Sequence, residues 1–283
     1  MPGTLFIVAT PIGNLEDITL RALRVLREVD LIAAEDTRRT ARLLAHYSIA
    51  SPTLSFHEHN TRTRIPDLLA RMEGGADVAL VTDAGTPGIS DPGCELVRVC
   101  GEKGFPIDPV AGACAPVSAA VASGFPLESL TIFGFIPVRS KDRTRWISRA
   151  REVLSTFTCF ETPHRIVRTL TDASTLFGTR PIFVAREMTK LHQQFIHGYG
   201  ADIIGRLTSM KGEFTLVVGP AGTSAGVPEP MNEADIFDEF CHITEHVKNG
   251  RRSAVAALAK KHGYSTRYVY DLIERHKVLA YNQ

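Results

Sequence analysis

The first third of the chain alternates short apolar runs with longer amphipathic stretches. The apolar runs predict four strands, at residues 5–9 (LFIVA), 31–34 (LIAA), 51–56 (SPTLSF) and 78–81 (VALV). The amphipathic stretches predict helices over 19–28, 37–46, 64–72, 95–102 and 116–122. Strand–helix alternation of this kind is typical of a mostly parallel sheet covered by helices on both faces.

The pattern changes after SGFPLES at residues 123–129. Further strands are predicted at TIFGF, TFTCFE, IFVARE and FTLVVG, with helices over 145–154 and 165–176. This second set predicts an α/β unit with more antiparallel pairing. A Gly- and Pro-rich stretch without periodicity then follows at 219–230 and indicates a linker.

The last fifty or so residues carry helical patterns and no strand signal. One helical face contains Ile236, Phe237, Phe240, Ile243 and Val247. Ser253 is the expected N-cap of a second helix that ends at Gly263, and Ser265 of a third over 266–277. The last two helices resemble a helix-turn-helix.

These patterns predict two α/β domains and a small all-α domain. The expected boundaries are 1–125, 126–222, a linker at 223–231, and 232–283. A chain of 283 residues is long enough for about two well-buried domains.

Composition excludes several classes of protein. The five cysteines are odd in number and form no CxxC pair, so neither a disulfide framework nor a thiolate zinc site is expected, and a reducing cytoplasm fits. LFIVA is too short for a signal peptide or a membrane span, and no membrane attachment is expected. The net charge of +1 gives no global sign of a nucleic-acid partner.

Several common catalytic motifs are absent from the sequence. No strand is followed by GxGxxG, and GxxxxGK[ST], GxSxG and HExxH do not occur. His57-Glu-His59 could ligate a metal, but a lone HxH is more often a polar loop, so no metal is expected.

Polar loops follow all four predicted strands of the first domain. They read TPIGNLEDIT, EDTRRT, HEHN and TDAGTPGISDPG. Parallel strands would bring the four loops to one edge of the sheet, where ligands of open α/β sheets bind. One polar loop of this kind would be ordinary, but four of them together predict a site. In the last loop, glycines and prolines between Gly85 and Gly93 suggest backbone that approaches a ligand.

Three charged motifs in the second α/β domain are expected to line the same site. They are FETPHR at 160–165, AREMTK at 185–190 and KGE at 211–213. A cleft between two domains is a common place for a ligand.

Taken in order, these motifs resemble those of a known enzyme family. VATPIGNLEDIT, AAEDTRRT, FHEHN, LVTDAGTPGISDPG, GACAPVSA, FETPHR, AREMTK and KGEFTLVV are similar in order and spacing to the ribosomal RNA small subunit methyltransferase I family of the tetrapyrrole-methylase superfamily. The resemblance covers about residues 4 to 220. The C-terminal helices resemble the small helical domain that many members carry.

The resemblance implies a class III methyltransferase fold, S-adenosylmethionine as cofactor, and 2′-O-methylation of a cytidine ribose in the decoding region of 16S rRNA. It also implies a homodimer. By motif, the cofactor residues would be Thr10, Pro11, Asp83, Ala84, Gly85, Thr86, Pro87, Gly88, Ile89, Cys114, Ala115, Phe160, Glu161, Ala185 and Phe214. The chain departs from the family at Gln193, where members often have an acidic residue.

Methyl transfer mainly requires alignment of donor and acceptor, and a ribose hydroxyl benefits from a base. The candidates are Glu35, Asp36, His57, His59, Glu161 and Lys211. We expect Asp36 to be the catalytic group, with Arg38 orienting the phosphate or ribose. The alternative is that Asp36 caps the helix that begins with TRRTARLL.

Local positive charge indicates where RNA would bind. Residues 138–151 contain six basic residues, one acidic residue and Trp146. The expected RNA-binding residues are His59, Asn60, Arg139, Lys141, Arg143, Arg145 and Arg165. The alternative is a solvated helix face with Trp146 in the core. The basic C-terminal helices, which carry Tyr264, Tyr268 and Tyr270, could contact RNA or a partner subunit.

Two other functions fit parts of the sequence. An enzyme of the same superfamily could act on a tetrapyrrole, although the basic stretches and the extra helices argue against a small anionic macrocycle. A DNA-binding regulator would use the helix-turn-helix, but AVAALAKKHGYS offers few polar side chains for reading bases. That reading also leaves the motifs at the strand ends unexplained.

Overall fold

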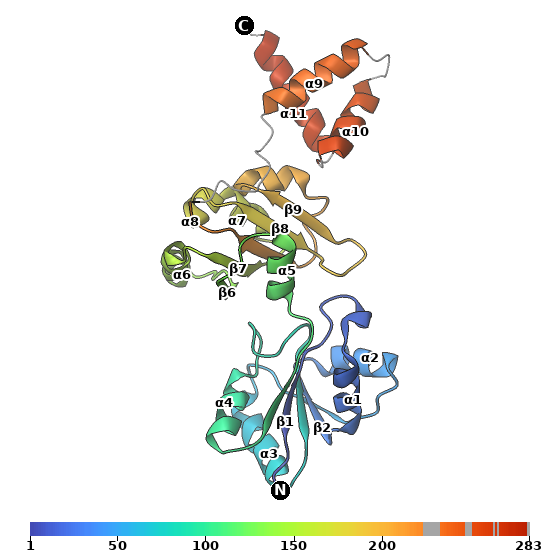
Figure 1. Ribbon diagram of the computed structural model, residues 1–283, viewed down its shortest axis with the longest axis vertical. Coiled ribbons are helices and arrows are strands. Elements are labelled where there is room, and N and C mark those ends of the chain that lie inside the picture. The colour runs from blue at the N-terminus through green and yellow to red at the C-terminus, as the bar shows by residue number, and fades with distance from the viewer. Residues whose placement is uncertain (223–232, 247–250, 263, 265, 282–283) are drawn as a thin grey trace. The chain divides into compact units, whose positions relative to one another are not determined.

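The computed structural model describes residues 1–222, 233–246, 251–262, 264 and 266–281 (Figure 1). The chain divides into two compact units. The first contains residues 1–118 together with 188–191, and the second contains 119–187 and 192–283. The division falls inside helix α5 (Ala115–Ser123), whereas the sequence placed it after residue 125.

The first unit is built on a five-stranded sheet in the order β3-β2-β4-β1-β5. Its strands are β1 (Leu5–Val8), β2 (Leu31–Ala34), β3 (Thr53–Ser55), β4 (Val78–Val81) and β5 (Ile107–Val110). Every neighbouring pair is parallel, which confirms the predicted sheet. Strand β5 was not predicted, because IDPV contains Asp108 and Pro109. A proline is tolerated there because β5 lies at the edge of the sheet.

Helices cover both faces of this sheet (Figure 1). Helices α1 (Leu20–Glu28) and α2 (Thr37–His46) pack on one face, and α3 (Thr61–Glu73) and α4 (Cys94–Glu102) pack on the other. Successive side chains of a strand point to opposite faces of the sheet, so one strand can contribute to both cores. In β2, Ile32 packs with the side chains of α1 and α2, and Ala33 packs with those of α3 and α4.

The second unit contains a mixed sheet in the order β6-β7-β10-β8-β9. Its strands are β6 (Leu130–Phe135), β7 (Thr156–Glu161), β8 (Ile182–Arg186), β9 (Gln194–Gly198) and β10 (Phe214–Val218). Only the β6–β7 pair is parallel, so the prediction of more antiparallel pairing is confirmed. Strand β9 was not predicted, because the polar residues Gln194 and His197 interrupt its apolar pattern.

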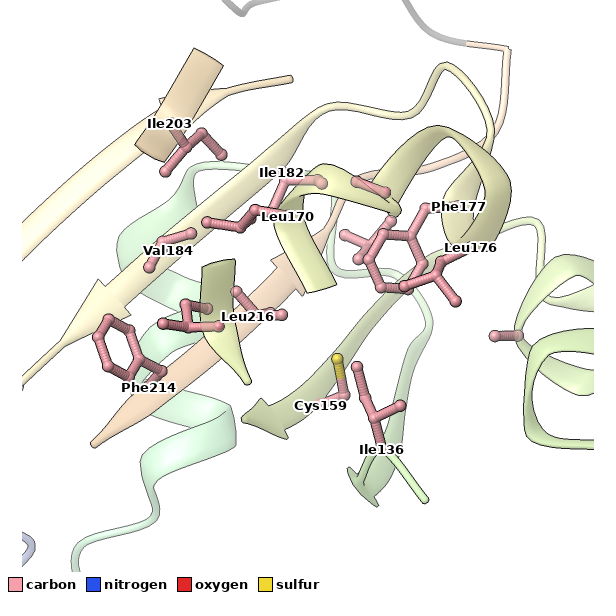
Figure 2. Close-up of a cluster of buried hydrophobic side chains, with 14 of the residues drawn as sticks. Ile136, Cys159, Leu170, Leu176, Phe177, Ile182, Val184, Ile203, Phe214 and Leu216 are labelled. Carbon is pink, nitrogen blue, oxygen red and sulfur yellow. The ribbon is translucent and has the colours of Figure 1, made fainter. Parts of the chain in front are cut away.

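One face of this sheet is covered by α6 (Ser140–Glu152), α7 (Ile166–Thr171), α8 (Ala173–Phe177) and η2 (Gly200–Arg206). Figure 2 shows the resulting core, in which Leu170 and Phe177 meet strand residues such as Leu216. Trp146 of α6 is also buried there, as the solvated-helix alternative expected.

The C-terminal helices α9 (Glu233–His246), α10 (Arg251–His262) and α11 (Thr266–Tyr281) share a hydrophobic cluster of their own. The predicted apolar face of α9 is confirmed for Ile236, Phe237, Phe240 and Ile243, while Val247, Gly263 and Ser265 lie outside the described residues. The prediction that Ser253 is an N-cap is wrong, because α10 begins at Arg251. Among the described helices, none is both long and apolar enough to cross a membrane.

Candidate functional site

Strands β1 and β4 are neighbours whose following helices leave to opposite faces of the sheet. The chain continues from β1 into α1 on one face and from β4 into α4 on the other. Such a switch point opens a crevice outside the carboxyl ends of the strands, and ligands of open α/β sheets bind there.

The loops after β1 and β4 are joined at this point by backbone hydrogen bonds. The Thr10 N–H donates to the Gly85 carbonyl at 2.9 Å, and the Gly85 N–H donates to the Thr10 carbonyl at 3.0 Å. The Thr10 hydroxyl donates to the Thr82 carbonyl at 3.1 Å. The Thr86 hydroxyl donates to the Ala113 carbonyl at 3.0 Å, which ties in the loop after β5. Three strand ends therefore share one bonded network.

All predicted cofactor residues of the first unit lie in these three loops. They are Thr10 and Pro11 after β1, Asp83, Ala84, Gly85, Thr86, Pro87, Gly88 and Ile89 after β4, and Cys114 and Ala115 at the start of α5. Gly85 has a φ of +86°, and Gly93 has a φ of +137° with space for a Cβ blocked by Leu80 Cδ2 at 2.8 Å. The sharp path of the β4 loop thus depends on glycine.

A group of carboxylates holds the β2 and β4 loops together. Asp83 Oδ1 accepts the Asp36 N–H at 3.1 Å, and Glu35 Oε2 accepts the Asp83 N–H at 3.2 Å. Arg39 forms an ion pair with Asp83 at 3.2 Å. The sequence did not single out Arg39, although it lies within the EDTRRT motif.

Two of the carboxyl groups here hold their protons more tightly than usual. Burial, followed by the charge of Asp83, raises the pKa of Glu35, against the lowering effect of its hydrogen bond from the Asp83 backbone. Burial raises the pKa of Asp91 to about 7, and the charges of Glu35 and Asp83 add to this. The sequence signal for Asp91 was its place in SDPG after the glycine-rich turn, but nothing in the pattern showed that Glu35 and Asp83 would face it.

Asp36 is the N-cap of α2, as its alternative interpretation expected. Its side chain accepts the Arg38 N–H at 2.9 Å and the Arg38 guanidinium at 3.1 and 2.9 Å. The hydrogen bonds from Arg38 lower the pKa of Asp36 to about 2. A carboxylate with so low a pKa is a weak proton acceptor.

The β3 loop is held by its own polar groups. Asn60 Oδ1 accepts the His57 N–H at 2.9 Å, and Asn60 Nδ2 donates to the Ser55 carbonyl at 3.1 Å. The side-chain amide of Asn60 therefore stabilises the loop. Of the two predicted RNA-binding residues here, His59 and Asn60, only His59 is exposed.

Residues 188–191, the end of the AREMTK motif and the residue after it, belong to the first unit and not to the second. Thr189 Oγ1 accepts the Asn14 N–H at 3.0 Å. A Cβ on Gly13 would lie 2.5 Å from Lys190 Cγ and 2.7 Å from Thr189 Oγ1. The β1 loop thus needs glycine at 13 because this segment approaches so closely.

In the second unit, two of the predicted cofactor residues have side chains committed to the fold. The buried Glu161 carboxylate pairs with Arg165 at 2.7 Å and accepts the Thr169 hydroxyl at 2.7 Å. Phe214 lies in the hydrophobic core (Figure 2). Ala185 is also buried, whereas the ring of Phe160 is half-buried at the end of β7.

The predicted RNA-binding cations fall into two classes. Arg139, Lys141 and Arg145 are exposed at the start of α6. Arg143 pairs with Asp172 at 3.7 Å and is largely covered. Arg165 is half-buried and donates to the Ile136 carbonyl at 2.8 Å in addition to its ion pair. The last two cations are therefore engaged within the fold.

Other parts of the first unit offer less chemistry. A hollow of about 590 Å³ lies at the opposite, amino-terminal edge of the sheet, lined by Met1, Pro2, Glu73, Gly74, Lys103, Gly104 and Phe105. Within the described part of the chain, no group of three or more His, Cys, Asp or Glu side chains is arranged to hold a metal ion.

Solved structures share this architecture. Uroporphyrin-III-C-methyltransferase from Thermus thermophilus aligns with a TM-score of 0.56 at 21% identity, covering 77% of this chain and 94% of that one. A second structure of that enzyme, complexed with S-adenyl homocysteine, aligns with a TM-score of 0.54 at 17% identity, covering 77% of this chain and 97% of that one. At these identities the likeness shows the fold.

Sequence relatives are much closer. Ribosomal RNA small subunit methyltransferase I of Synechocystis sp. is 41% identical over 95% of this chain and 97% of its own length. The protein of the same name from Thermotoga maritima is 48% identical over 76% of this chain and 98% of its own length. The model of the tetrapyrrole (corrin/porphyrin) methylases matches residues 4–204. The chain therefore belongs to the tetrapyrrole methylases and, within them, to the ribosomal RNA small subunit methyltransferase I family.

Proposed function

We propose that this protein is an enzyme that methylates the 2′-hydroxyl of a cytidine ribose in the decoding region of 16S rRNA, with S-adenosylmethionine as the methyl donor. The observation that carries the proposal is its membership of the family, through relatives that it matches over nearly their whole length. The joined loops at the β1–β4 switch point support the proposal, because ligands of open α/β sheets bind at such positions.

When bound, S-adenosylmethionine supplies an activated methyl group on a positively charged sulfur. Glu35, Asp83 and Asp91 bring three carboxyl groups to the crevice, and those that are ionised suit a cationic ligand. We assign cofactor contacts to Thr10, Pro11, Asp83, Ala84, Gly85, Thr86, Pro87, Gly88, Ile89, Cys114, Ala115, Phe160, Glu161, Ala185 and Phe214. For Glu161 and Phe214 the contact would come from the backbone, because their side chains are buried.

The ribose hydroxyl must lose its proton as its oxygen gains the methyl group. Asp36 is poorly suited to accept that proton, because Arg38 lowers its pKa. Glu35 and Asp91 have raised pKa values and are better matched to the task. Asp36 and Arg38 would therefore orient the substrate as a pair. Glu35 or Asp91 would accept the proton from the ribose hydroxyl.

The RNA would be held by exposed cations, chiefly Arg139, Lys141 and Arg145, with His59 at the β3 loop. A homodimer and a cytoplasmic location belong to the same proposal. Light scattering coupled to size exclusion measures the oligomeric state directly.

Two measurements test the function. S-adenosylmethionine should raise the melting temperature of the protein, because a ligand that binds the native state stabilises it. The protein should also add one ribose methyl group to 16S rRNA in small subunits purified from cells lacking its gene, mapped by mass spectrometry. Absence of both effects would overturn the proposal, and methyl transfer to uroporphyrinogen III in place of RNA would favour the tetrapyrrole alternative.

A further inference from the structure

The last residue of β6, Phe135, is exposed, although Phe133 before it and Ile136 after it contribute to the hydrophobic core. Phe133 packs against Trp146 and Phe157, with ring centroids 5.3 Å away in each case. Ile136 is 1% exposed and lies among the core side chains (Figure 2). Phe135 between them is 52% exposed. A contiguous exposed apolar patch can mark a contact surface, so the surroundings of Phe135 matter.

A β-bulge explains why Phe135 leaves the core. Ile132 pairs with Thr158, but Phe135 pairs with Phe160, so three steps on β6 match two steps on β7. Gly134, in the left-handed region with a φ of +69°, lies inside this irregularity. With strict alternation Phe135 would face the same side as Phe133, and the extra residue turns it to the other side. Bulges that redirect a side chain in this way are frequent next to functional sites.

On that side, Phe135 meets a second aromatic ring. Its ring centroid is 5.2 Å from that of Phe160, at an interplanar angle of 42°. Phe160 is itself half-buried at the end of β7. The two rings form a partly open apolar platform at the ends of two parallel strands.

Cations follow the platform directly in the chain. Val138 is 77% exposed, and beyond it Arg139 and Lys141 are exposed at the start of α6. Neither cation forms an ion pair with another residue that the structure describes. An aromatic platform beside cations of this kind is the combination that binds unpaired nucleotides, because bases stack on the rings and phosphates meet the charges.

We infer that Phe135, supported by Phe160, is a stacking platform for an unpaired base of the RNA substrate, with Arg139 and Lys141 beside it on the neighbouring phosphates. The inference rests on the proposed function and deepens it, since it names a residue that selects single-stranded RNA over duplex. In a duplex the bases are already stacked on each other, so they cannot stack on a protein ring.

The test compares Phe135→Ala with Phe135→Tyr and with Phe195→Ala. Phe195 is a matched control, because it is an aromatic residue on β9, at the other edge of the same sheet, with 40% of its surface exposed. Binding is measured by fluorescence anisotropy with a labelled single-stranded RNA oligonucleotide and with the same strand in a duplex. Calorimetry measures the affinity for S-adenosylmethionine.

Phe135→Ala should weaken single-strand binding by about 5- to 150-fold, the range expected for one lost base–aromatic stack. Phe135→Tyr keeps the ring and should restore most of the affinity, while Phe195→Ala should bind like the wild type. Duplex binding should be little changed in all three variants. Circular dichroism identifies a variant that has not folded. If Phe135→Ala does not fold, Phe135→Tyr is compared with Phe135→Leu, which keeps apolar bulk without the ring. Weaker single-strand binding by Phe135→Leu supports stacking, and equal binding contradicts it.

Three results would overturn the inference: unchanged single-strand affinity in Phe135→Ala, loss of S-adenosylmethionine affinity alone, or a change of oligomeric mass alone. The second would place Phe135 in the cofactor wall, and the third would place it against a second copy of the chain. Methylation of small subunits by the wild type is measured in parallel. Its failure would count against the proposed function, whereas the binding comparison judges Phe135 separately.

Discussion

Thr10 and Gly85 exchange a pair of backbone hydrogen bonds, although one follows β1 and the other follows β4. These two hydrogen bonds join the loop after β1 to the loop after β4 at the point where the strands end. Because both bonds use backbone atoms, they depend on the positive-φ conformation that Gly85 adopts.

Replacing Gly85 with Val should weaken S-adenosylmethionine binding by about tenfold or more. The φ of +86° would be strained by about 1–2 kcal/mol in a residue with a side chain, and the new Cβ would lie 3.4 Å from Ile12 Cγ2. Calorimetry measures the affinity, and urea denaturation measures the stability.

Gly104→Val is the matched control for this change. Gly104 also lies in the first unit with a positive φ, +78°, but a Cβ there meets nothing within 4 Å. It should lose similar stability while keeping its affinity. Equal loss of affinity in both variants would mean that general destabilisation, and not the crevice, explains the Gly85 result.

Asp83→Ala should also reduce cofactor affinity, and by more than Asp83→Asn. The Ala variant loses both the bond from the Asp36 N–H and the ion pair with Arg39, whereas Asn keeps an oxygen acceptor. Asp30→Ala is the control, because Asp30 accepts the Asp77 N–H at 2.8 Å just before β2, at the other end of the strands. If Asp30→Ala lowers the affinity as much, the crevice assignment is wrong.

Asp91 should make the first unit less stable as the pH rises from about 4 to about 7. Its pKa is raised on folding, so the native state binds the proton more tightly than the unfolded chain, and that advantage disappears on ionisation. Asp91→Asn has no such ionisation. Its melting temperature relative to the wild type should therefore rise by several degrees between pH 5 and pH 8. A constant difference across this range would show that Asp91 titrates normally.

Removing the exposed cations of α6 should weaken RNA binding without affecting the cofactor. The triple variant Arg139→Ala, Lys141→Ala, Arg145→Ala should reduce the slope of log affinity against log salt by about 2–3. Arg143 is left intact, because its pairing with Asp172 serves the fold. Alanine at the exposed Arg24, Arg98 and Lys103 of the first unit removes the same charge and should leave the slope nearly unchanged.

The parts of the fold that rest on uniform hydrophobic runs could be predicted from the sequence. LIAA and VALV became buried strands because every residue in them is apolar. IDPV and QFIHG did not stand out, since an edge strand tolerates Pro109 and a strand with one half-open face tolerates His197. Local pattern does not reveal which strands will be edges.

The site was predictable as a set of loops but not as a set of contacts. Parallel pairing alone brings the strand-end motifs to one edge, so the glycine-rich loop and the EDTRRT loop could be placed together in advance. The burial of Asp91 beside Glu35 and the outward turn of Phe135 depend on packing across the sheet and on one bulge. Neither depends on the spacing of residues in the chain.

The segment 188–191 also bears on how the protein is made. Its Thr189 holds the loop that begins at Thr10, so the first unit is not a continuous stretch of chain. A ribosome that has translated the first 118 residues has produced every strand of that unit but not this last support for it. Early domains usually fold while later ones are still being synthesised. Here the support of the β1 loop by Thr189 can form only after most of the second α/β sheet has been translated. A chain interrupted before residue 188 therefore leaves the proposed methyl-donor crevice incomplete.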